Sequence, residues 1–274
     1  MLLSRLAERG TVSLEQRVAD LLPGFADRTA GRATLGDLAS HRSGLPRLHP
    51  RSAVASLRSA YAVHRGRDPY RGMDRAEFLG RAAAITSAGT PGEFEYSNLG
   101  MSLLGHALAA GTNPEGRYQA LLERELLTPL RMTRTVVHTG PEPLPDVPDD
   151  LALPHNRNGR PGEPWRSEGY APSGVGVWST AQDLARLLLA IIEERAPGMD
   201  AARPRFDAEG PNRIGLGWFI LTRDGREVTW HNGGTGGSCS FIGIDRENGR
   251  GAVVLSNTNH DVDSLGAHLI LAED

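Results

Sequence analysis

The chain has 274 residues, of which 39% are hydrophobic and 23% charged, and its formal net charge is −3. This composition is ordinary for a globular protein and supplies enough apolar residues for a sizeable core. The small net charge does not indicate a nucleic-acid partner, and no run of about eighteen apolar residues predicts a membrane span. A single cysteine, Cys239, excludes an internal disulfide.

Lysine is absent from the sequence, because all 30 residues counted as Lys or Arg are arginines. Codon bias in a GC-rich genome is the simplest interpretation of the absence. It still has a chemical consequence, since no mechanism that needs a lysine amine can run on this chain alone.

The first ten residues predict a helix with Leu2, Leu3 and Leu6 on one face and Gly10 at its end. They do not have the charged and long apolar regions of a signal peptide. They read as the middle of an amphipathic helix, so we expect the chain to begin partway into that helix. A cytoplasmic location is expected if Met1 is the true start; otherwise the localisation stays open.

Apolar periodicity and helix-start signals predict further helices along the first two thirds of the chain. They cover residues 34–40, 73–86, 98–110, 114–127 and 179–192. The helix over 98–110 consists of small and apolar residues and should be buried. Segments rich in Arg, Ser, His or Pro are expected to be irregular, at residues 46–72, 140–150 and 154–169.

The pattern then changes to alternating strands, at residues 214–222, 227–231, 240–245 and 252–257. Turns at Asp224-Gly225 and Asn248-Gly249 connect them as antiparallel neighbours. A last helix is predicted over 262–271. Helices followed by antiparallel strands indicate a mixed α/β (α+β) fold.

Several common catalytic and binding motifs are absent. The sequence has no Gly-x-Ser-x-Gly, His-Glu-x-x-His or Cys-x-x-Cys, and no phosphate-binding loop. We therefore expect no metal and no cofactor. Scattered histidines are expected to be surface or hydrogen-bonded residues rather than ligands; they are His41, His49, His155, His260 and His268.

Two short segments do suggest chemistry. Tyr96-Ser97-Asn98 precedes the small-residue helix, where a helix N-terminus could tune the phenol toward a phenolate and present the amide to a carbonyl. The same pattern fits a core tyrosine followed by an N-capping asparagine. The second segment begins at His231-Asn232 and continues with the glycine-rich residues 233–237. Glycines there would let a substrate backbone approach and expose N–H donors, although an ordinary hairpin also fits.

Together the two segments resemble the family of class C β-lactamases, penicillin-binding D-alanyl-D-alanine carboxypeptidases, D-aminopeptidases and related esterases. Tyr96-Ser97-Asn98 matches its Tyr-x-Asn motif, and His231-Asn232-Gly233 matches its Lys-Thr-Gly or His-x-Gly motif. Other segments resemble family sequences, including PLRM at 129–132 beside the family's PLGM; they lie at 38–46, 129–132, 173–185, 214–218 and 253–257. The resemblance runs from about residue 1 to the end.

The resemblance implies a β-lactamase/transpeptidase-like fold: one domain over 1–274, with an antiparallel sheet flanked by helices and an all-helical lobe. The helical lobe is expected over about 30–200. The sheet lobe is expected over about 201–274 together with the helix at 1–10, without the two N-terminal strands that the family adds to its sheet.

The resemblance also implies roles for individual residues. Tyr96 resembles the general base, Asn98 the side chain that orients the substrate amide, and Gly234 an oxyanion donor. Gly233 and Thr235 complete the substrate-binding strand. His231 replaces a lysine, and because histidine is mostly neutral near pH 7, this change favours the esterase and aminopeptidase branch.

The family's first motif, Ser-x-x-Lys, supplies the nucleophile and its partner amine, and it has no match in this chain. Residues 1–10 resemble the continuation of its helix, so the motif should lie just upstream of Met1. Three hypotheses remain. The chain belongs to an active serine hydrolase that acts on an ester, amide or D-amino peptide and is inactive as given, to a non-catalytic protein that binds a peptide-like or acyl ligand, or to a poorly folding gene product. The oligomeric state stays open.

Overall fold

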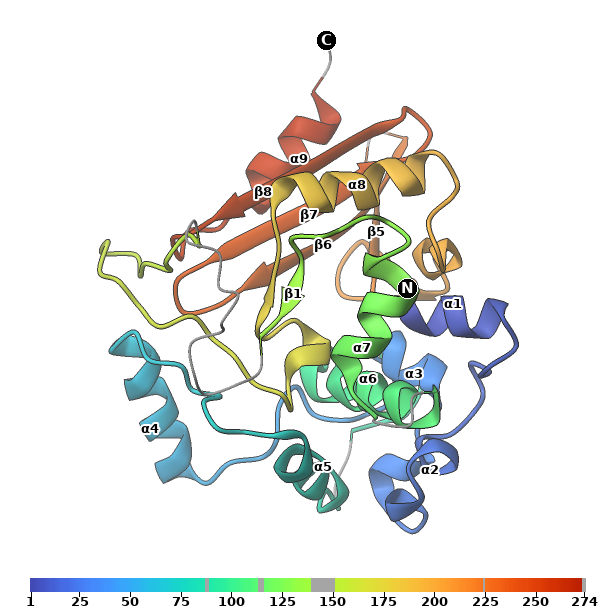
Figure 1. Cartoon of the computed structure of the whole chain (residues 1–274), viewed down its shortest axis with the longest axis vertical. Helices are drawn as coiled ribbons and strands as arrows, with labels where there is room; N and C mark the ends of the chain where they lie inside the picture. The colour runs from blue at the N-terminus through green and yellow to red at the C-terminus, as the bar shows by residue number, and fades with distance from the viewer. Residues whose placement is uncertain (87–88, 113–115, 139–150, 224, 273–274) are drawn as a thin grey trace.

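We describe a computed structural model of the chain, which covers all residues except 87–88, 113–115, 139–150, 224 and 273–274 (Figure 1). The helices are α1 (Leu2–Glu8), α2 (Val18–Leu21), α3 (Leu35–Ala39), α4 (Ala53–His64), α5 (Arg75–Ala83), α6 (Asn98–Thr112), α7 (Tyr118–Leu122), α8 (Ala181–Ile192) and α9 (Asp263–Leu271). A π-helical segment, Glu123–Leu127, continues α7. Short 3₁₀ turns lie at Pro23–Phe25, Thr29–Arg32, Ala171–Ser173 and Met199–Ala202.

The strands form two sheets. A small one pairs β1 (Val136–Val137) with β2 (Val177–Trp178). The large one is an antiparallel meander of six strands in chain order: β3 (Phe206–Asp207), β4 (Asn212–Ile214), β5 (Phe219–Arg223), β6 (Arg226–Gly234), β7 (Cys239–Asp245) and β8 (Arg250–Ser256). Within the described residues β8 is an edge strand. The mixed fold with an antiparallel sheet and flanking helices confirms the expected fold class.

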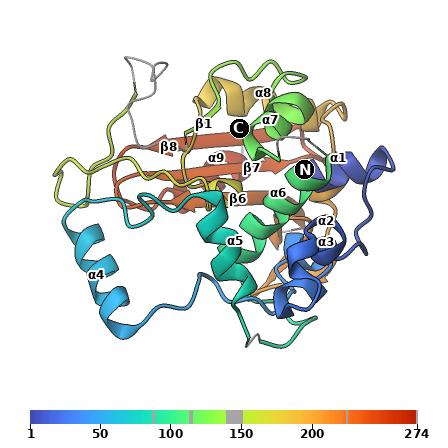
Figure 2. The same cartoon turned by 60° about the horizontal axis from the view of Figure 1, so that its bottom comes forward.

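The large sheet lies between two helical layers (Figures 1 and 2). On β7, Phe241 belongs to the small core beneath α9, whereas Ile244 belongs to the main core. Side chains alternate between the faces of a strand, so one strand supplies both cores. Helix α8 contacts β7 and β8, although the sequence predicts it in the helical lobe.

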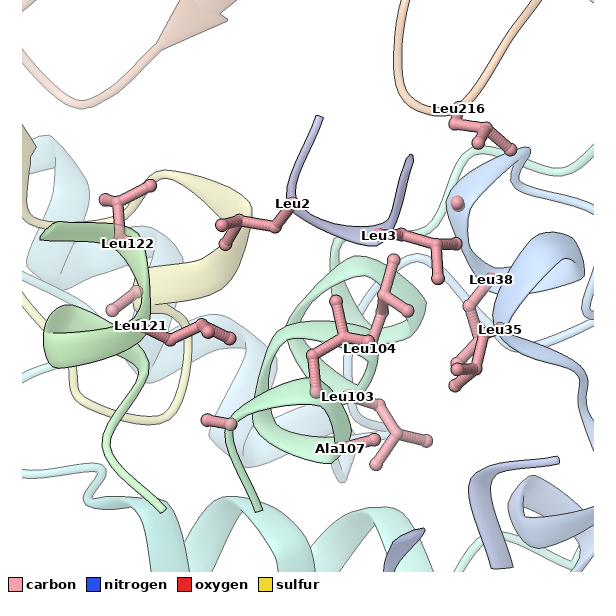
Figure 3. Packing of buried hydrophobic residues seen from close by; sticks show 14 of the residues in the cluster. Leu2, Leu3, Leu35, Leu38, Leu103, Leu104, Ala107, Leu121, Leu122 and Leu216 are labelled. Atoms are coloured by element: carbon pink, nitrogen blue, oxygen red, sulfur yellow. The ribbon is translucent and has the colours of Figure 1, made fainter. Parts of the chain in front are cut away.

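The main core joins the N-terminal helix α1 to helices from the middle of the chain and to a residue next to the sheet (Figure 3). Leu3 of α1 is 2% exposed and lies near Leu104 of the buried helix α6. Leu216, in the connection before β5, belongs to the same core. Burying such side chains stabilises the fold by about 1.5–3 kcal/mol each.

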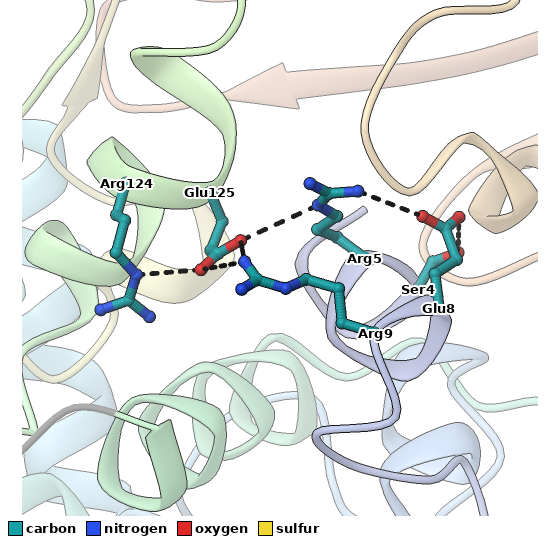
Figure 4. Close-up of polar contacts among 6 residues, drawn as sticks. All are labelled: Ser4, Arg5, Glu8, Arg9, Arg124 and Glu125. Carbon is teal, nitrogen blue, oxygen red and sulfur yellow. Dashed lines mark hydrogen bonds and ion pairs between the residues drawn. The ribbon is translucent and has the colours of Figure 1, made fainter.

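A buried carboxylate also links α1 to the π-helical segment (Figure 4). Glu125, whose side chain is 4% exposed, accepts hydrogen bonds from Arg9 Nη1 at 3.0 Å and Arg124 Nε at 2.9 Å. Arg5 Nε lies 3.8 Å from the same carboxylate. These contacts hold α1 against the helical layer.

Most predicted elements are confirmed, but two expectations are wrong. The segment 46–72 is not wholly irregular, because it contains α4, whose N-cap Ser52 accepts the Ala55 N–H at 3.2 Å. The strand predicted over 214–222 is two strands, since Gly217 adopts φ +87° and the Gly215 N–H bonds the Trp218 carbonyl at 2.8 Å. The strands β1, β2 and β3 were not predicted, and the loop predicted at 140–150 lies outside the described residues.

None of the helices in the described part of the chain combines the length and the apolar character that crossing a bilayer requires.

Candidate active site

The segment around Tyr96 is placed by the start of α6. Ser97 caps that helix: its Oγ accepts the Gly100 N–H at 2.8 Å and donates to the Pro46 carbonyl at 2.8 Å. Asn98, the first helical residue, therefore has no capping role, and its carboxamide has no hydrogen-bond partner among the described residues. The alternative in which Asn98 caps the helix is wrong, and its side chain is available to a ligand.

His231 is placed by the central strand β6, where it pairs with Ile242 of β7. Its Nδ1 lies 2.6 Å from the Asn232 carbonyl oxygen. The Asn232 carboxamide in turn donates to Asp263, at the first turn of α9, at 2.6 Å. The backbone of β6 thus orients this imidazole, and α9 holds the side chain of the neighbouring Asn232.

One pocket of about 270 Å³ brings Tyr96, Asn98 and His231 together. Helix α1 supplies Leu2 and Leu3 to its wall, and other walls come from α6 and the connection before β5. A mostly apolar pocket with a few converging polar groups is typical of a small-molecule site. Residue 231, far from residues 96 and 98 in the sequence, thus lines the same pocket as they do.

The glycine segment lies farther along β6, and Gly233, Gly234 and Thr235 do not line this pocket. The Thr235 hydroxyl accepts the Ser238 N–H at 3.1 Å, and the Thr235 N–H donates to the Ser238 carbonyl at 2.9 Å. Thr235 therefore belongs to the β6–β7 turn.

The backbone direction of Gly234 follows from the ladder. Successive N–H groups of a strand point to opposite edges, so the N–H of Gly234 faces away from β7 because that of Thr235 faces β7. On that side β5 pairs with β6 only as far as Phe219 opposite Trp230. The Gly234 N–H thus lies beyond the end of β5, on an exposed stretch of strand.

Tyr96 is held among aromatic and basic groups. Its ring centroid is 4.4 Å from that of His41 and 6.3 Å from that of Phe219, and the Arg47 guanidinium lies 5.2 Å from the ring centre. Burial raises the pKa of Tyr96, and the charge of Arg47 offsets only part of the effect. The phenol is therefore protonated near pH 7, and the expected tuning toward a phenolate is not met in this chain.

Two histidines of the pocket are neutral near pH 7. Burial lowers the pKa of His231, against the opposing effects of its hydrogen bond to Asn232 and of Asp263. Burial lowers the pKa of His41 to about 3, and a proton on neighbouring His231 would lower it in the same direction. The sequence predicts a neutral group at His231 in place of the family's lysine ammonium, and the lowered pKa of His231 agrees with this prediction.

His41 is the pocket residue that the sequence reasoning missed as a functional group. The sequence pattern predicts it as one of the scattered histidines, yet it lines the pocket and is only 2% exposed. A signal existed, since His41 lies in the family-like segment 38–46. The described residues contain no group of three or more His, Cys, Asp or Glu placed to hold a metal ion.

An antiparallel sheet between helical layers, with a pocket where a buried helix begins beside the central strand, defines a serine β-lactamase-like protein. The chain belongs to the Beta-lactamase family, whose model matches residues 1–273.

Individual relatives agree with this family. A human protein described as "Putative beta-lactamase-like 1" is 31% identical over 231 residues, covering 81% of this chain and 42% of the relative. The Escherichia coli K12 "D-alanyl-D-alanine-carboxypeptidase/endopeptidase AmpH" is 26% identical, covering 93% of this chain and 66% of the relative. The chain thus spans about two fifths to two thirds of their length. A class C β-lactamase structure, 18% identical, superposes with a TM-score of 0.79 and covers 100% of this chain and 78% of that one.

Proposed function

We propose that the pocket binds a peptide-like or acyl ligand, and that the chain contributes this site to a β-lactamase-related serine hydrolase. The reaction class is acyl-enzyme hydrolysis of an ester, an amide or a D-amino peptide. The observation that carries the proposal is the convergence of Tyr96, Asn98 and His231 in one pocket. The name of the AmpH relative, a D-alanyl-D-alanine carboxypeptidase, supports a peptide-like ligand.

Each residue has a role that its surroundings support. Asn98, left free by the Ser97 cap, orients a ligand carbonyl or amide. The Gly234 N–H, at the exposed end of β6 and outside the pocket, is the oxyanion donor that the family resemblance implies. Tyr96 passes protons to or from the reacting group. It works as a base only when a cation lowers its pKa, and Arg47 is the cation that acts on it here.

These 274 residues contain no lysine and hence no Ser-x-x-Lys. They therefore do not supply the nucleophile of the family motif. Ser173 lines the pocket, but its hydroxyl donates to the Tyr170 carbonyl at 2.9 Å. This hydrogen bond supports a second candidate function, in which the residues bind a ligand without forming an acyl-enzyme.

The two candidates are separated by the upstream reading frame and by intact-mass spectrometry. The hydrolase predicts an in-frame Ser-x-x-Lys a few residues ahead of Met1, and a chain that includes it should form an adduct with a fluorophosphonate or benzylpenicillin. The 274 residues alone should bind benzylpenicillin saturably without an adduct. A frame that lacks the motif contradicts the hydrolase, and an adduct on the 274 residues contradicts the binding function.

Site assignment is tested by Asn98→Ala. Losing one ligand hydrogen bond, worth about 1–1.5 kcal/mol, should weaken benzylpenicillin binding roughly tenfold. Thr235→Ala, in the turn outside the pocket, is the matched control and should bind within about twofold of the original chain. Equal affinities of all three proteins would contradict the assigned pocket.

A further inference from the structure

Two imidazoles lie near the Tyr96 ring in the pocket. The centroid of His41 is 4.4 Å from that of Tyr96, and the centroid of His231 is 6.4 Å from it. Both imidazoles line the pocket. Because each is neutral near pH 7, each carries one N–H donor and one bare nitrogen acceptor, and their hydrogen bonds decide which nitrogen is which.

His41 is fixed as an Nε2–H donor. The Ser97 backbone N–H lies 3.2 Å from its Nδ1, and since an amide N–H can only donate, Nδ1 must be the bare acceptor. The hydrogen is therefore on Nε2. This buried nitrogen has no hydrogen-bond partner among the described residues, and an unsatisfied buried donor costs about 1–3 kcal/mol.

The backbone holds His41 in a strained conformation that keeps the ring in the pocket. Its φ is +56°, a left-handed value that is uncommon for a residue other than glycine. The Glu95 N–H donates to the His41 carbonyl at 2.8 Å and secures this turn. Strain of this kind persists where the surroundings enforce it, often at functional sites.

His231 has the opposite tautomer. Its Nδ1 faces the carbonyl oxygen of Asn232, which can only accept, so Nδ1 carries the hydrogen and Nε2 is bare. No described residue donates to Nε2. The pocket thus offers a donor at His41 and an acceptor at His231.

We propose that these two imidazoles recognise an amide group of the ligand, with His41 Nε2–H donating to its carbonyl oxygen and His231 Nε2 accepting its N–H. The proposal rests on the proposed function, because it uses the same pocket, and it narrows the ligand to amides over esters. An ester offers the carbonyl oxygen but no N–H, so it would leave the His231 acceptor unpaired. Sites built to hydrogen-bond an N–H discriminate strongly against analogues that lack it.

The experiment compares two matched probes that contain no other amide, N-methyl-3-phenylpropanamide and methyl 3-phenylpropanoate, by ligand-observed NMR titration at pH 7.5. The original chain should bind the amide at least about tenfold more tightly, which corresponds to one hydrogen bond of about 1.4 kcal/mol. Nitrogen-15 spectra should show hydrogen on Nε2 of His41 and on Nδ1 of His231.

Three variants separate the two contacts. His231→Phe removes the acceptor and should reduce the amide-to-ester ratio to about 1–2. His41→Asn keeps an acceptor for the Ser97 N–H and tolerates positive φ, but lacks the Nε2 donor, so both probes should bind roughly tenfold more weakly at an unchanged ratio. His49→Asn alters a buried histidine outside the pocket and should change neither affinity.

Each outcome has one meaning. Equal binding of the two probes to the original chain, or a ratio unaffected by His231→Phe, overturns the amide recognition and leaves the binding function standing. Binding of neither probe overturns both. If His41→Asn fails to fold, the ratio of the original chain and the His231→Phe result still decide the proposal.

Discussion

Glu125 shows how one side chain can couple stability to pH. Burial raises the pKa of its carboxyl, but the Arg124 hydrogen bond and the charge of Arg9 outweigh burial and lower it below 4.5. A depressed folded-state pKa gives stabilisation that is present above the unfolded pKa and lost as the pH falls through the folded pKa. Acid should therefore loosen the contact between α1 and the π-helical segment.

We expect Glu125→Gln to lower the free energy of unfolding at pH 7 by about 1–3 kcal/mol, because it removes charge-assisted hydrogen bonds from a buried position. The difference from the original chain should narrow below about pH 4.5. Urea unfolding at pH 7, 5 and 3.5 measures both effects. Glu123→Gln, an exposed neighbour, should change stability by less than about 0.5 kcal/mol, and a difference that is constant with pH would contradict the argument.

At the residue scale the sequence predicted three residues of the pocket, Tyr96, Asn98 and His231, because each lies in a short sequence motif. It did not reveal the role that we propose for His41. That role depends on the Ser97 N–H, which lies 56 positions away and determines the tautomer. It also did not reveal that Tyr96 is buried enough to raise its pKa.

Among the elements, helix α9 packs on β7 through a glycine. A Cβ on Gly266 would lie 2.1 Å from a ring carbon of Phe241, closer than real contacts allow. Gly80 in α5 has open space around it instead. Gly266 is therefore required by the close approach of α9 to the sheet, whereas packing does not require a glycine at position 80.

Gly266→Ala should destabilise the protein by about 1–3 kcal/mol, because overpacking pushes α9 away from the sheet. Gly80→Ala, its matched control, should stabilise it by about 0.5–1 kcal/mol, since alanine lowers the entropy cost of a helix. Chemical denaturation compares the two with the original chain. A neutral Gly266→Ala would contradict the close packing of α9.

At the element scale, the sequence predicted the helices that have a buried face or a strong N-cap, such as α6 and α8. Helix α4 was not predicted, because none of its residues is buried and its sequence has no apolar periodicity. Its cap at Ser52 was the remaining signal. The sequence did not predict the break between β4 and β5, because the break depends on a contact with another segment. A Cβ on Gly215 would lie only 2.3 Å from the Ala201 carbonyl oxygen.

Over the whole molecule, one core includes Leu6 of α1, Leu103 of α6, Trp218 before β5 and Ile244 of β7. Because helical and sheet layers share these contacts, we propose that they unfold together as a single domain. Exposing either layer alone would uncover the apolar surface of the other.

Unfolding in urea should therefore give one transition, with the same midpoint by tryptophan fluorescence and by far-ultraviolet circular dichroism. Two of the four tryptophans, Trp218 and Trp230, lie next to or in the large sheet, whereas the dichroism reports mainly on the helices. Leu6→Ala should lower the stability by about 2–5 kcal/mol and shift both signals equally. Two separate midpoints would contradict the single domain.

The sequence by itself determined the family, the order of helices and antiparallel strands, and three residues of the pocket, because motifs, caps and periodicity act over a few neighbouring residues. Only the tertiary structure decided that Ser97 rather than Asn98 caps α6, that Gly233, Gly234 and Thr235 lie outside the pocket, and that His41 faces Tyr96. These features depend on burial and on hydrogen bonds between segments far apart in the chain, which appear only when the chain is folded.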